Sequence, residues 1–466
     1  MIRWGLAVIL SAVAVTALAA SLTNGDLTRL SGPAPTVARA QVNGLIGYGQ
    51  SNEIGTHAQP ALSTTQPYSN ITFIGGVKAS HCPNGYSGVN CPQAAPSPGT
   101  GGGTSATVPL VEDNLQSNCY PDGTCPDLST SLAGETPGTA ALNKLVSMTQ
   151  TAGGAAPANN IWFYSAAGRG GETIALLQFG ATVFGQLQDG VQDQYRRTTD
   201  LGKSYALRFM DFMEGEADAL ANTAYSDYLT SLSTGIATPL NNLAKSVHQR
   251  ISLLPAYTLV MQTPYSITPA ANDCQVARAT IDGPATNSLI KFVSPIYPLY
   301  FWGGFGDGLH LNNVGQRLRA QYLGLALYNL DQLGTDPSYL KPLTVSYAAG
   351  TYTWAMSVPN LPLVIDTTTL GGATVQHGLR VVDTLGDIAL SNIRVSGSNI
   401  LADGAAPTGA WVGRIGCDTL GSGITITNGA GTDFRDSSTA TWTEPSNGLT
   451  YPLYNWAPAQ QLTGTP

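Results

Sequence analysis

Residues 42–52 read VNGLIGYGQSN, an apolar run that ends in glycines and is followed at once by Ser51. A continuous apolar run is typical of a strand buried on both faces of a parallel sheet, and the glycines predict an abrupt turn after it. A serine at such a turn exposes its hydroxyl beside backbone N–H groups. Taken alone, Ser51 is better explained as a helix cap, so the chemistry depends on the rest of the chain.

Strand and helix patterns alternate beyond this first strand. Short apolar runs are separated by longer segments in which apolar residues recur with helical spacing. Such alternation predicts a parallel sheet with helices on both faces, an α/β fold. The predicted strands are 42–49, 160–164, 204–210 and 257–261, and the predicted helices are 173–187, 223–233, 241–251 and 313–330.

From about residue 340 the pattern changes to short β-rich runs broken by Gly, Asn and Asp. These runs predict an all-β, sandwich-like module. We expect its tryptophans to pack in the core, with a sugar-binding face as the alternative. The runs are 343–347, 363–365, 379–382, 393–395 and 423–427, and the tryptophans are Trp354, Trp411, Trp442 and Trp456.

The domain organisation predicted for the 466 residues has three parts. Residues 1–20 are a signal peptide. Residues 41–338 form the α/β domain, with a Gly/Pro/Cys-rich insertion at about 80–138. Residues 339–466 form the β-rich module.

The first residues have the pattern of an export signal. Arg3 precedes an apolar run over residues 4–18, and the sequence ALA at 17–19 is the small-x-small pattern of a cleavage site. An uncleaved anchor is the alternative, but the run is shorter than the roughly 20 residues of a spanning helix. We expect a secreted or periplasmic protein with no membrane span after removal of the signal.

The composition excludes some partners. Charged residues make up only 11% of the chain, the net charge is −8, and no run of Lys or Arg occurs. Nucleic acid binding needs a concentrated basic surface, so nucleic acid is excluded as a partner. Neutral polymers or small esters fit better, and the oligomeric state stays open.

The six cysteines are even in number, and export makes disulfides their natural interpretation. Two short-range pairs, Cys82/Cys91 and Cys119/Cys125, fall in the insertion. Cys274 and Cys417 either join the two domains or stay unpaired. A metal site is the weaker alternative, because no His/Cys cluster has the spacing of zinc ligands.

A candidate general base precedes the last predicted helix of the α/β domain. Asp307 and His310 lie three residues apart in the stretch GDGLHL, so one loop can present the imidazole and the carboxylate that orients it. The other four histidines, His57, His81, His248 and His377, have no carboxylate in a comparable turn. An ordinary surface turn is the competing explanation.

A glycine-rich turn supplies a candidate oxyanion hole. The stretch SAAGRGGETI, residues 165–174, leads from a strand into a helix and includes Gly170 and Gly171. Glycine lets backbone N–H groups approach a developing negative charge. A nucleotide-binding loop is disfavoured, because neither GxGxxG nor GK[ST] spacing is present.

Four motifs together resemble the sialate O-acetylesterase-like branch of the SGNH hydrolases, which includes carbohydrate acetylesterases. The motifs are GQSN at 49–52, GGETI at 170–174, EGEAD at 214–218 and DGLH at 307–310. The resemblance spans residues 41–330 and implies a three-layer, flavodoxin-like fold. It makes Ser51 the nucleophile, Asp307 and His310 the rest of a triad, and Gly171 or Gly170 an oxyanion donor.

One position departs from the family pattern. The family's third block carries a Gln that donates to the oxyanion, and here Glu214 takes its place. An ionised carboxylate cannot donate, so Glu214 must be protonated, point away, or be replaced by a donor such as Asn52. Besides Glu214, we assign the oxyanion hole to Ser51, Gly170 and Gly171, and substrate contacts to Gln50 and Asn52.

The predicted function is hydrolysis of acetyl or other short acyl esters on carbohydrate through an acyl-serine intermediate, without metal or cofactor. A broader esterase or lipase is one alternative, since nothing in the sequence sets the acyl length. A catalytically silent carbohydrate-binding or adhesion protein on the same scaffold is the other, because of Glu214 and the β-module.

Overall fold

The computed structural model describes residues 40–79, 107–114, 133–154, 160–247, 254–263, 274–307, 309–370, 375–417 and 431–465. Its centre is a seven-stranded sheet in the order β3-β2-β4-β1-β5-β6-β7, in which only β3 runs antiparallel to its neighbour. The strands are β1 Val42–Gly49, β2 Ile71–Phe73, β3 Thr107–Pro109, β4 Ile161–Gly168, β5 Tyr205–Met213, β6 Tyr257–Gln262 and β7 Ile290–Pro295.

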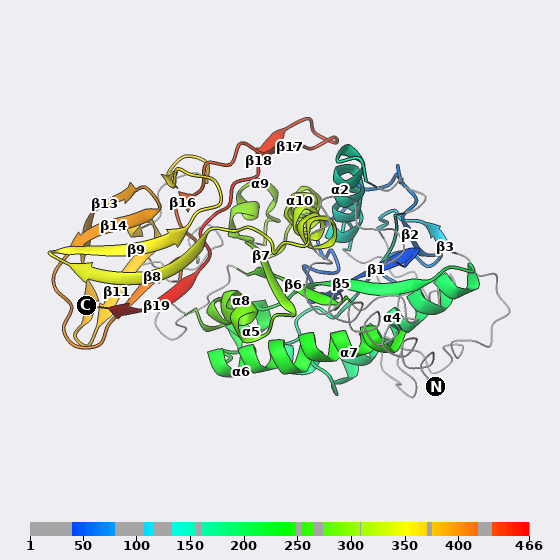
Figure 1. Ribbon diagram of the computed structural model, residues 1–466, viewed down its shortest axis with the longest axis horizontal. Helices are drawn as coiled ribbons and strands as arrows, with labels where there is room; N and C mark the ends of the chain where they lie inside the picture. The colour runs from blue at the N-terminus through cyan, green and yellow to red at the C-terminus, as the bar shows by residue number, and fades with distance from the viewer. Residues whose placement is uncertain are drawn as a thin grey trace, which may run out of the picture.

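Helices cover both faces of this sheet, as Figure 1 shows. Every residue of β1 and β5 is buried, which is why both read as continuous apolar runs. One face packs against α2 Pro137–Thr151 and α10 Asn313–Tyr328. The other face packs against helices that include α4 Thr182–Asp200, α7 Thr238–Val247 and α8 Gln275–Thr286.

The strand order determines where a site can form. Five of the parallel strands lie in the order β4-β1-β5-β6-β7. If they are numbered one to five along the chain, this order is 2-1-3-4-5, the flavodoxin-like arrangement. Chain connections reverse direction at β1, and ligands of such sheets bind beside the carboxyl ends of the strands at this point. The segments after β1, β4 and β5 therefore meet at one edge.

Several predicted helices differ in extent from those observed. Residues 173–187 form two helices, α3 Ile174–Leu177 and α4, separated by a turn at Gly180 whose φ is +90°. Residues 225–247 form one continuous helical stretch: α6 Tyr225–Thr230, the π-helical turn Ser231–Ala237 and α7. The sequence did not predict α2, α8 or β7; α8 contains Pro284, which weakens its helical pattern.

The predicted insertion contributes to the main sheet. Residues 107–109 form its edge strand β3, paired with β2, and α2 begins at Pro137. The pairs Cys82/Cys91 and Cys119/Cys125 lie outside the described residues, as does the predicted signal peptide. In the part of the chain that the structure describes, no helix is long and apolar enough to cross a membrane.

The C-terminal part is an eight-stranded, largely antiparallel sheet in the order β12-β11-β15-β19-β8-β9-β14-β13. In Figure 1 it lies at the opposite end of the molecule from β2 and β3. The sheet curls on itself, as a contact between two of its strands shows. β19 separates β15 from β8, yet a Cβ at Gly413 in β15 would lie 2.8 Å from the Val345 side chain in β8. The strands are β8 Lys341–Ala348, β9 Thr351–Ser357, β11 Leu379–Asp383, β12 Gly386–Ile388, β13 Leu390–Ser396, β14 Asn399–Gly404, β15 Val412–Ile415 and β19 Gln460–Thr465; the short strands β10 Val364–Ile365, β16 Phe434–Arg435, β17 Thr441–Thr443 and β18 Thr450–Pro452 form two further pairs.

The prediction of an α/β domain followed by an all-β module is confirmed. Trp354, Trp411 and Trp456 are buried, as expected for core residues, and Trp442 is half-buried. The predicted run 423–427 lies outside the described residues. The boundary at residues 338/339 stays a prediction.

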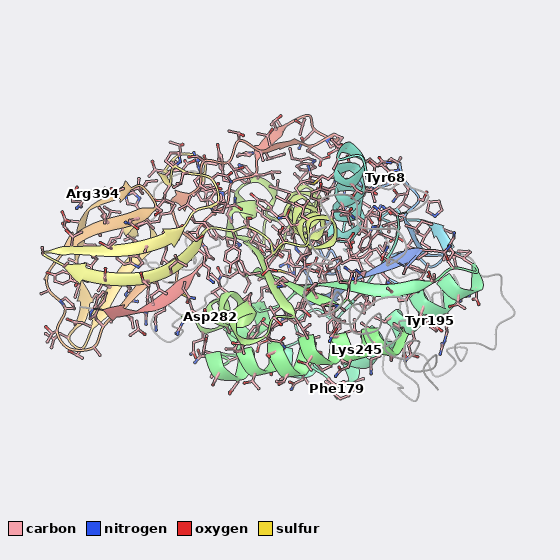
Figure 2. All side chains as sticks on the ribbon, in the orientation of Figure 1. Tyr68, Phe179, Tyr195, Lys245, Asp282 and Arg394 are labelled. Atoms are coloured by element: carbon pink, nitrogen blue, oxygen red, sulfur yellow. A yellow bond between two sulfur atoms is a disulfide. The ribbon has the colours of Figure 1, made fainter. Side chains whose placement is uncertain are left out.

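Specific contacts join the module to the α/β part. Cys274 and Cys417 form a disulfide, so these two cysteines join the two parts of the chain and do not stay unpaired. The Gln262 side chain donates to the Ala459 carbonyl at 2.9 Å and accepts from the Ala459 N–H at 2.6 Å. Asp282, labelled in Figure 2, accepts a hydrogen bond from Gln460. Because these partners are distant in sequence, only the fold brings them together.

The β17–β18 hairpin extends this contact toward α10. Glu444 lies in the hairpin and forms a 2.8 Å ion pair with Arg317 of α10. The Tyr451 and Trp442 rings pack against the same core as α2 and α10. Residues 441–452 thus complete the hydrophobic core of the α/β part.

Candidate active site

Ser51 lies at the carboxyl edge of the sheet, in the turn that follows β1. Gly49 has a φ of +153°, and a Cβ at this position would lie 1.9 Å from the Met213 carbonyl oxygen, so only glycine fits. The Gln50 N–H donates to the same carbonyl at 2.9 Å, and the Glu53 N–H donates to the Gln50 carbonyl at 2.9 Å. These bonds turn the chain sharply and leave the Ser51 side chain partly exposed.

The structure brings Ser51, His310 and Asp307 into one hydrogen-bonded chain. His310 Nε2 is 2.8 Å from Ser51 Oγ, and His310 Nδ1 is 2.6 Å from Asp307 Oδ2. With the ring proton on Nδ1, Nε2 is free to accept the serine proton. This is the order of contacts that a nucleophile, a general base and an orienting carboxylate require.

Asp307 is held in its ionised form by local hydrogen bonds. Partial burial by itself raises the pKa of Asp307, but bonds from the His310 ring and from the backbone N–H groups of Leu309 and His310 outweigh this effect and lower the pKa. The two N–H groups donate to Oδ1 at 2.9 and 3.0 Å. One carboxylate oxygen thus fixes the loop, and the other is left for the imidazole.

The loop that carries His310 is closed at its base. Gly304 pairs with Leu311, and the Phe305 N–H donates to the His310 carbonyl at 2.7 Å. Asn312 then caps α10 by accepting from the Gly315 N–H at 2.9 Å. Because the β-bridge and the helix cap restrain the two ends of the loop, the His310 imidazole has little freedom to leave its position.

Asn52 links the serine turn to the histidine loop. Its side-chain oxygen accepts from the Leu311 N–H at 3.0 Å, and its amide nitrogen donates to Glu216 at 2.9 Å and to the Leu309 carbonyl at 3.2 Å. The Gln50 amide donates to the Glu172 carbonyl and to Glu214 Oε1. Both side chains, predicted to bind substrate, are buried and bonded to protein groups.

The glycine turn after β4 lies against the nucleophile. The position of a Cβ at Gly170 is 3.5 Å from Ser51 Cβ, whereas a Cβ at Gly171 would contact none of the described atoms within 4 Å. The Arg169 N–H donates to the Gly49 carbonyl at 2.9 Å, which fixes this turn beside the serine turn. Gly170 therefore lies beside Ser51, and the space next to Gly171 is open among the described residues.

Glu214 follows β5 and is buried at the same edge of the sheet. Burial raises its pKa well above 4.5, and the negative charge of Asp218 raises the pKa further. Its Oε1 accepts from Gln50 Nε2 at 3.0 Å. If it keeps its proton, Glu214 resembles the glutamine of the family pattern in shape and in offering both a donor group and an acceptor.

A charged network lies beneath the serine turn. Arg319 of α10 is fully buried and contacts Glu53 at 2.6 Å and Asp211 at 2.7 Å. Arg319 also donates to the Asn52 carbonyl at 3.3 Å, and Gln316 donates to the same carbonyl at 2.6 Å. The residue after the nucleophile is therefore tied to α10, the helix that follows the histidine loop.

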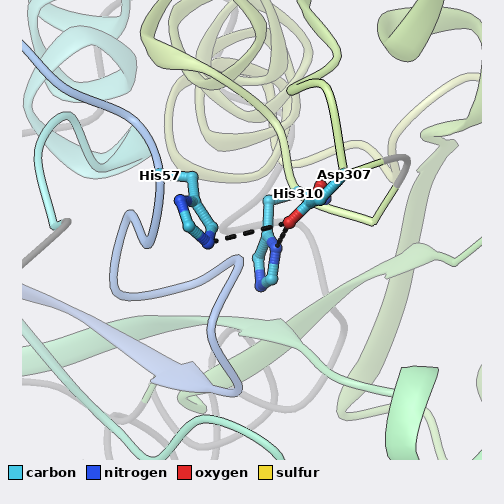
Figure 3. Close-up of side chains that lie close together, drawn as sticks. All are labelled: His57, Asp307 and His310. Carbon is cyan, nitrogen blue, oxygen red and sulfur yellow. Dashed lines mark hydrogen bonds and ion pairs between the residues drawn. The ribbon is translucent and has the colours of Figure 1, made fainter.

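His57 is a third side chain beside Asp307 that the sequence did not single out. Its Nε2 is 3.7 Å from Asp307 Oδ2, and its ring centre is 4.8 Å from that of His310 (Figure 3). No local signal marks it, because its partners lie about 250 residues further along the chain.

His57, Asp307 and His310 each offer an atom that could bind a metal, all within 4.8 Å of one another. Zinc bonds of about 2.1 Å would place tetrahedral ligand atoms about 3.4 Å apart. The 2.6 Å contact between His310 and Asp307 is shorter, and fits a shared proton better than a shared metal.

Comparison with solved structures identifies counterparts of the fold. A carbohydrate acetylesterase from Xanthomonas citri aligns with a TM-score of 0.52 and 12% identity, over 90% of this chain and 80% of its own. NanS matches with a TM-score of 0.38 and 13% identity, over 62% of this chain and 98% of its own. A variant of an acetyl xylan esterase from Geobacillus stearothermophilus matches with a TM-score of 0.27 and 12% identity, over 63% and 96%.

Of these three, only the Xanthomonas citri structure is similar enough to support a conclusion, and that conclusion concerns the fold. The chain has an SGNH hydrolase-like fold, as its motifs predicted. Comparisons with protein-family models and with curated protein sequences found no match.

Proposed function

We propose that the protein is a serine esterase with Ser51 as nucleophile, His310 as general base and Asp307 as the orienting carboxylate. The hydrogen-bonded chain from Ser51 Oγ through both ring nitrogens of His310 to Asp307 carries the proposal. A lone serine hydroxyl is a weak nucleophile, and this arrangement activates it.

The reaction proceeds through an acyl-serine. His310 Nε2 takes the Ser51 proton as Oγ attacks the ester carbonyl, and the resulting oxyanion accepts hydrogen bonds from backbone N–H groups of Ser51 and of Gly170 or Gly171. His310 then returns the proton to the leaving alcohol oxygen. A water molecule gives a proton to His310 as its oxygen attacks the acyl carbon. The bond from that carbon to Ser51 Oγ then breaks, His310 returns the proton to Oγ, and the carboxylic acid leaves.

The proposed substrate is an O-acetylated carbohydrate. The similarity of fold to a carbohydrate acetylesterase supports this choice, as does the small number of charged side chains. Export from the cytoplasm, proposed from the first 20 residues, is consistent with the Cys274–Cys417 disulfide, because such bonds persist in oxidising compartments.

Covalent labelling with a fluorophosphonate tests the nucleophile, and peptide mapping should locate the label on Ser51. Hydrolysis of p-nitrophenyl acetate tests the reaction. Ser51→Ala and His310→Ala should each lower kcat by at least about 10³-fold with the melting temperature preserved. Turnover close to that of the unmodified protein in either variant would overturn the assignment.

A second assay addresses the substrate class. We expect the protein to release acetate from acetylated sugars faster than it cleaves p-nitrophenyl esters with acyl chains of eight or more carbons. The acetylated sugars to be tested are xylan, sialic acid and hexoses. Equal rates on long acyl chains would favour a broad esterase, and no turnover of any ester would favour a binding protein.

A further inference from the structure

His57 has an unusual backbone conformation. Its φ is +63°, in the left-handed region that residues other than glycine rarely occupy. Asparagine and aspartate tolerate this region through local hydrogen bonds, but histidine gains less from it. Such strain persists when the surrounding structure imposes it, and it concentrates at functional sites.

This conformation places the His57 ring over the pair formed by His310 and Asp307. The ring stacks on Phe305 with centres 4.3 Å apart and an interplanar angle of 16°. Its Nε2 points at Asp307 Oδ2, as the dashed line in Figure 3 shows. The side chain of His57 is 20% exposed and that of Asp307 is 31% exposed, so His57 covers part of the carboxylate and leaves the rest open to solvent.

The contact bears on how the carboxylate is oriented. Asp307 Oδ1 accepts two backbone N–H groups, and Oδ2 accepts the His310 ring. An oxygen of a carboxylate accepts two hydrogen bonds, so Oδ2 has one acceptor position left, on the side that His57 approaches. The distance of 3.7 Å is beyond a hydrogen bond, and contacts of this kind often shorten only in the complex with substrate.

We propose that His57 is a positioning residue of the esterase, which acts through Asp307 by fixing the orientation of its carboxylate. The inference rests on the proposed function. A carboxylate with a second partner keeps the imidazole in the orientation that accepts the serine proton.

His377 provides a matched control within the same chain. It too has a left-handed backbone, with φ of +54°, a carboxylate partner, Asp433, at 2.7 Å, and an aromatic neighbour, Phe434. His377 belongs to the β-module and not to the proposed site. Histidine-to-phenylalanine changes at both positions keep an aromatic ring on a left-handed backbone and remove a carboxylate contact, and only the change at His57 faces the triad.

The test compares His57→Phe, which keeps the stacked ring and removes the N–H, with His57→Gln, which restores an N–H near the position of Nε2. We expect His57→Phe to lower kcat for p-nitrophenyl acetate about tenfold, with KM changed less than about twofold. His57→Gln should recover at least about a third of the lost rate, and His377→Phe should leave kcat unchanged.

Stability gives an independent readout. His57→Gly removes the ring and the backbone strain together, so we expect a melting temperature equal to or higher than that of the unmodified protein, with a lower kcat. A residue with only a structural role would show the opposite, a lower melting temperature with kcat preserved.

A double-mutant cycle shows whether His57 acts through Asp307. In an Asp307→Asn background, His57→Phe should change kcat less than about twofold. The inference fails if His57→Phe matches the unmodified enzyme, or if its effect is equally large without the Asp307 carboxylate. The proposed function fails separately, if the unmodified protein has no esterase activity or if Ser51→Ala retains it.

Discussion

Replacing Arg319 with Met tests the buried network beneath the nucleophile turn. Arg319 faces two carboxylates, Glu53 and Asp211, and all three side chains are fully buried. Burial and then the Asp211 charge raise the pKa of Glu53 well above 4.5, against the opposing effect of Arg319. Arg319 therefore supplies the positive charge that balances the negative charge of this buried pair of carboxyl groups.

The Arg319→Met change removes the positive charge and leaves the negative one without a partner. Removing one member of a buried ion pair typically destabilises a protein by about 3–5 kcal/mol. The pKa of Asp211, already raised by burial, should rise further without Arg319. A raised folded-state pKa means that stability is lost as pH rises from the unfolded pKa to the folded one, at about 1.4 kcal/mol per pH unit.

Denaturant unfolding at pH 5 and pH 8 provides the measurement. We expect Arg319→Met to lose more stability at pH 8 than at pH 5, and the double change Arg319→Met with Asp211→Asn to recover most of the loss at pH 8. The Asn52 carbonyl also loses a donor, so kcat should fall with stability. Arg394→Met, which breaks an exposed pair with Asp403, is the control and should leave the melting temperature unchanged.

Two results would refute this reasoning. One is a loss for Arg319→Met that does not depend on pH, because it would mean that no buried carboxylate is left uncompensated. The other is a double variant that is less stable than Arg319→Met alone, because the two side chains would then contribute independently.

Four further predictions concern the site and the link between the two parts of the chain. Asp307→Asn should lower kcat by about 10²- to 10⁴-fold with KM little changed, in a steady-state assay, and a loss below twofold would remove Asp307 from the mechanism. Glu214→Gln should leave kcat near that of the unmodified enzyme at pH 6 and raise the melting temperature at pH 9. The raised pKa of Glu214 makes the native carboxyl lose stability as pH rises, whereas the amide cannot ionise; equal melting temperatures at both pH values would contradict this. The double change Cys274→Ser with Cys417→Ser removes a disulfide that spans 143 residues, and it should lower the free energy of unfolding, measured with denaturant, by about 2–5 kcal/mol. Truncation after residue 338 should expose apolar surface of the α/β part and cause aggregation. A monomeric truncated protein with the original kcat would show that the module is dispensable.

Local signals in the sequence were sufficient for the main architecture and for the candidate triad. An apolar run ending in glycines marks β1 and the turn that carries Ser51, and the DGLH stretch marks the histidine loop. Each signal lies within about ten residues, where backbone preferences and side-chain spacing act directly. The same is true of the short β-rich runs broken by Gly, Asn and Asp, which predicted the second part of the chain.

Signals that are weak or spread over many residues did not lead to correct predictions. Helix α8 contains an internal proline, and α2 begins inside a segment rich in Gly and Pro. The break between α3 and α4 depends on Gly180, a residue that a helical pattern tolerates. In these segments local preference conflicts with the fold, and packing against the sheet decides the outcome.

The sequence by itself predicted an α/β part followed by an all-β part, and it singled out the residues that we propose for an esterase reaction. The tertiary structure alone decided that Ser51 and His310, 259 residues apart, lie 2.8 Å from each other, and that Cys274 pairs with Cys417. It also decided that His57 lies beside Asp307. The physical reason is that side-chain spacing acts over one or two turns of chain, whereas contacts between distant residues depend on how helices and strands pack to bury their apolar faces.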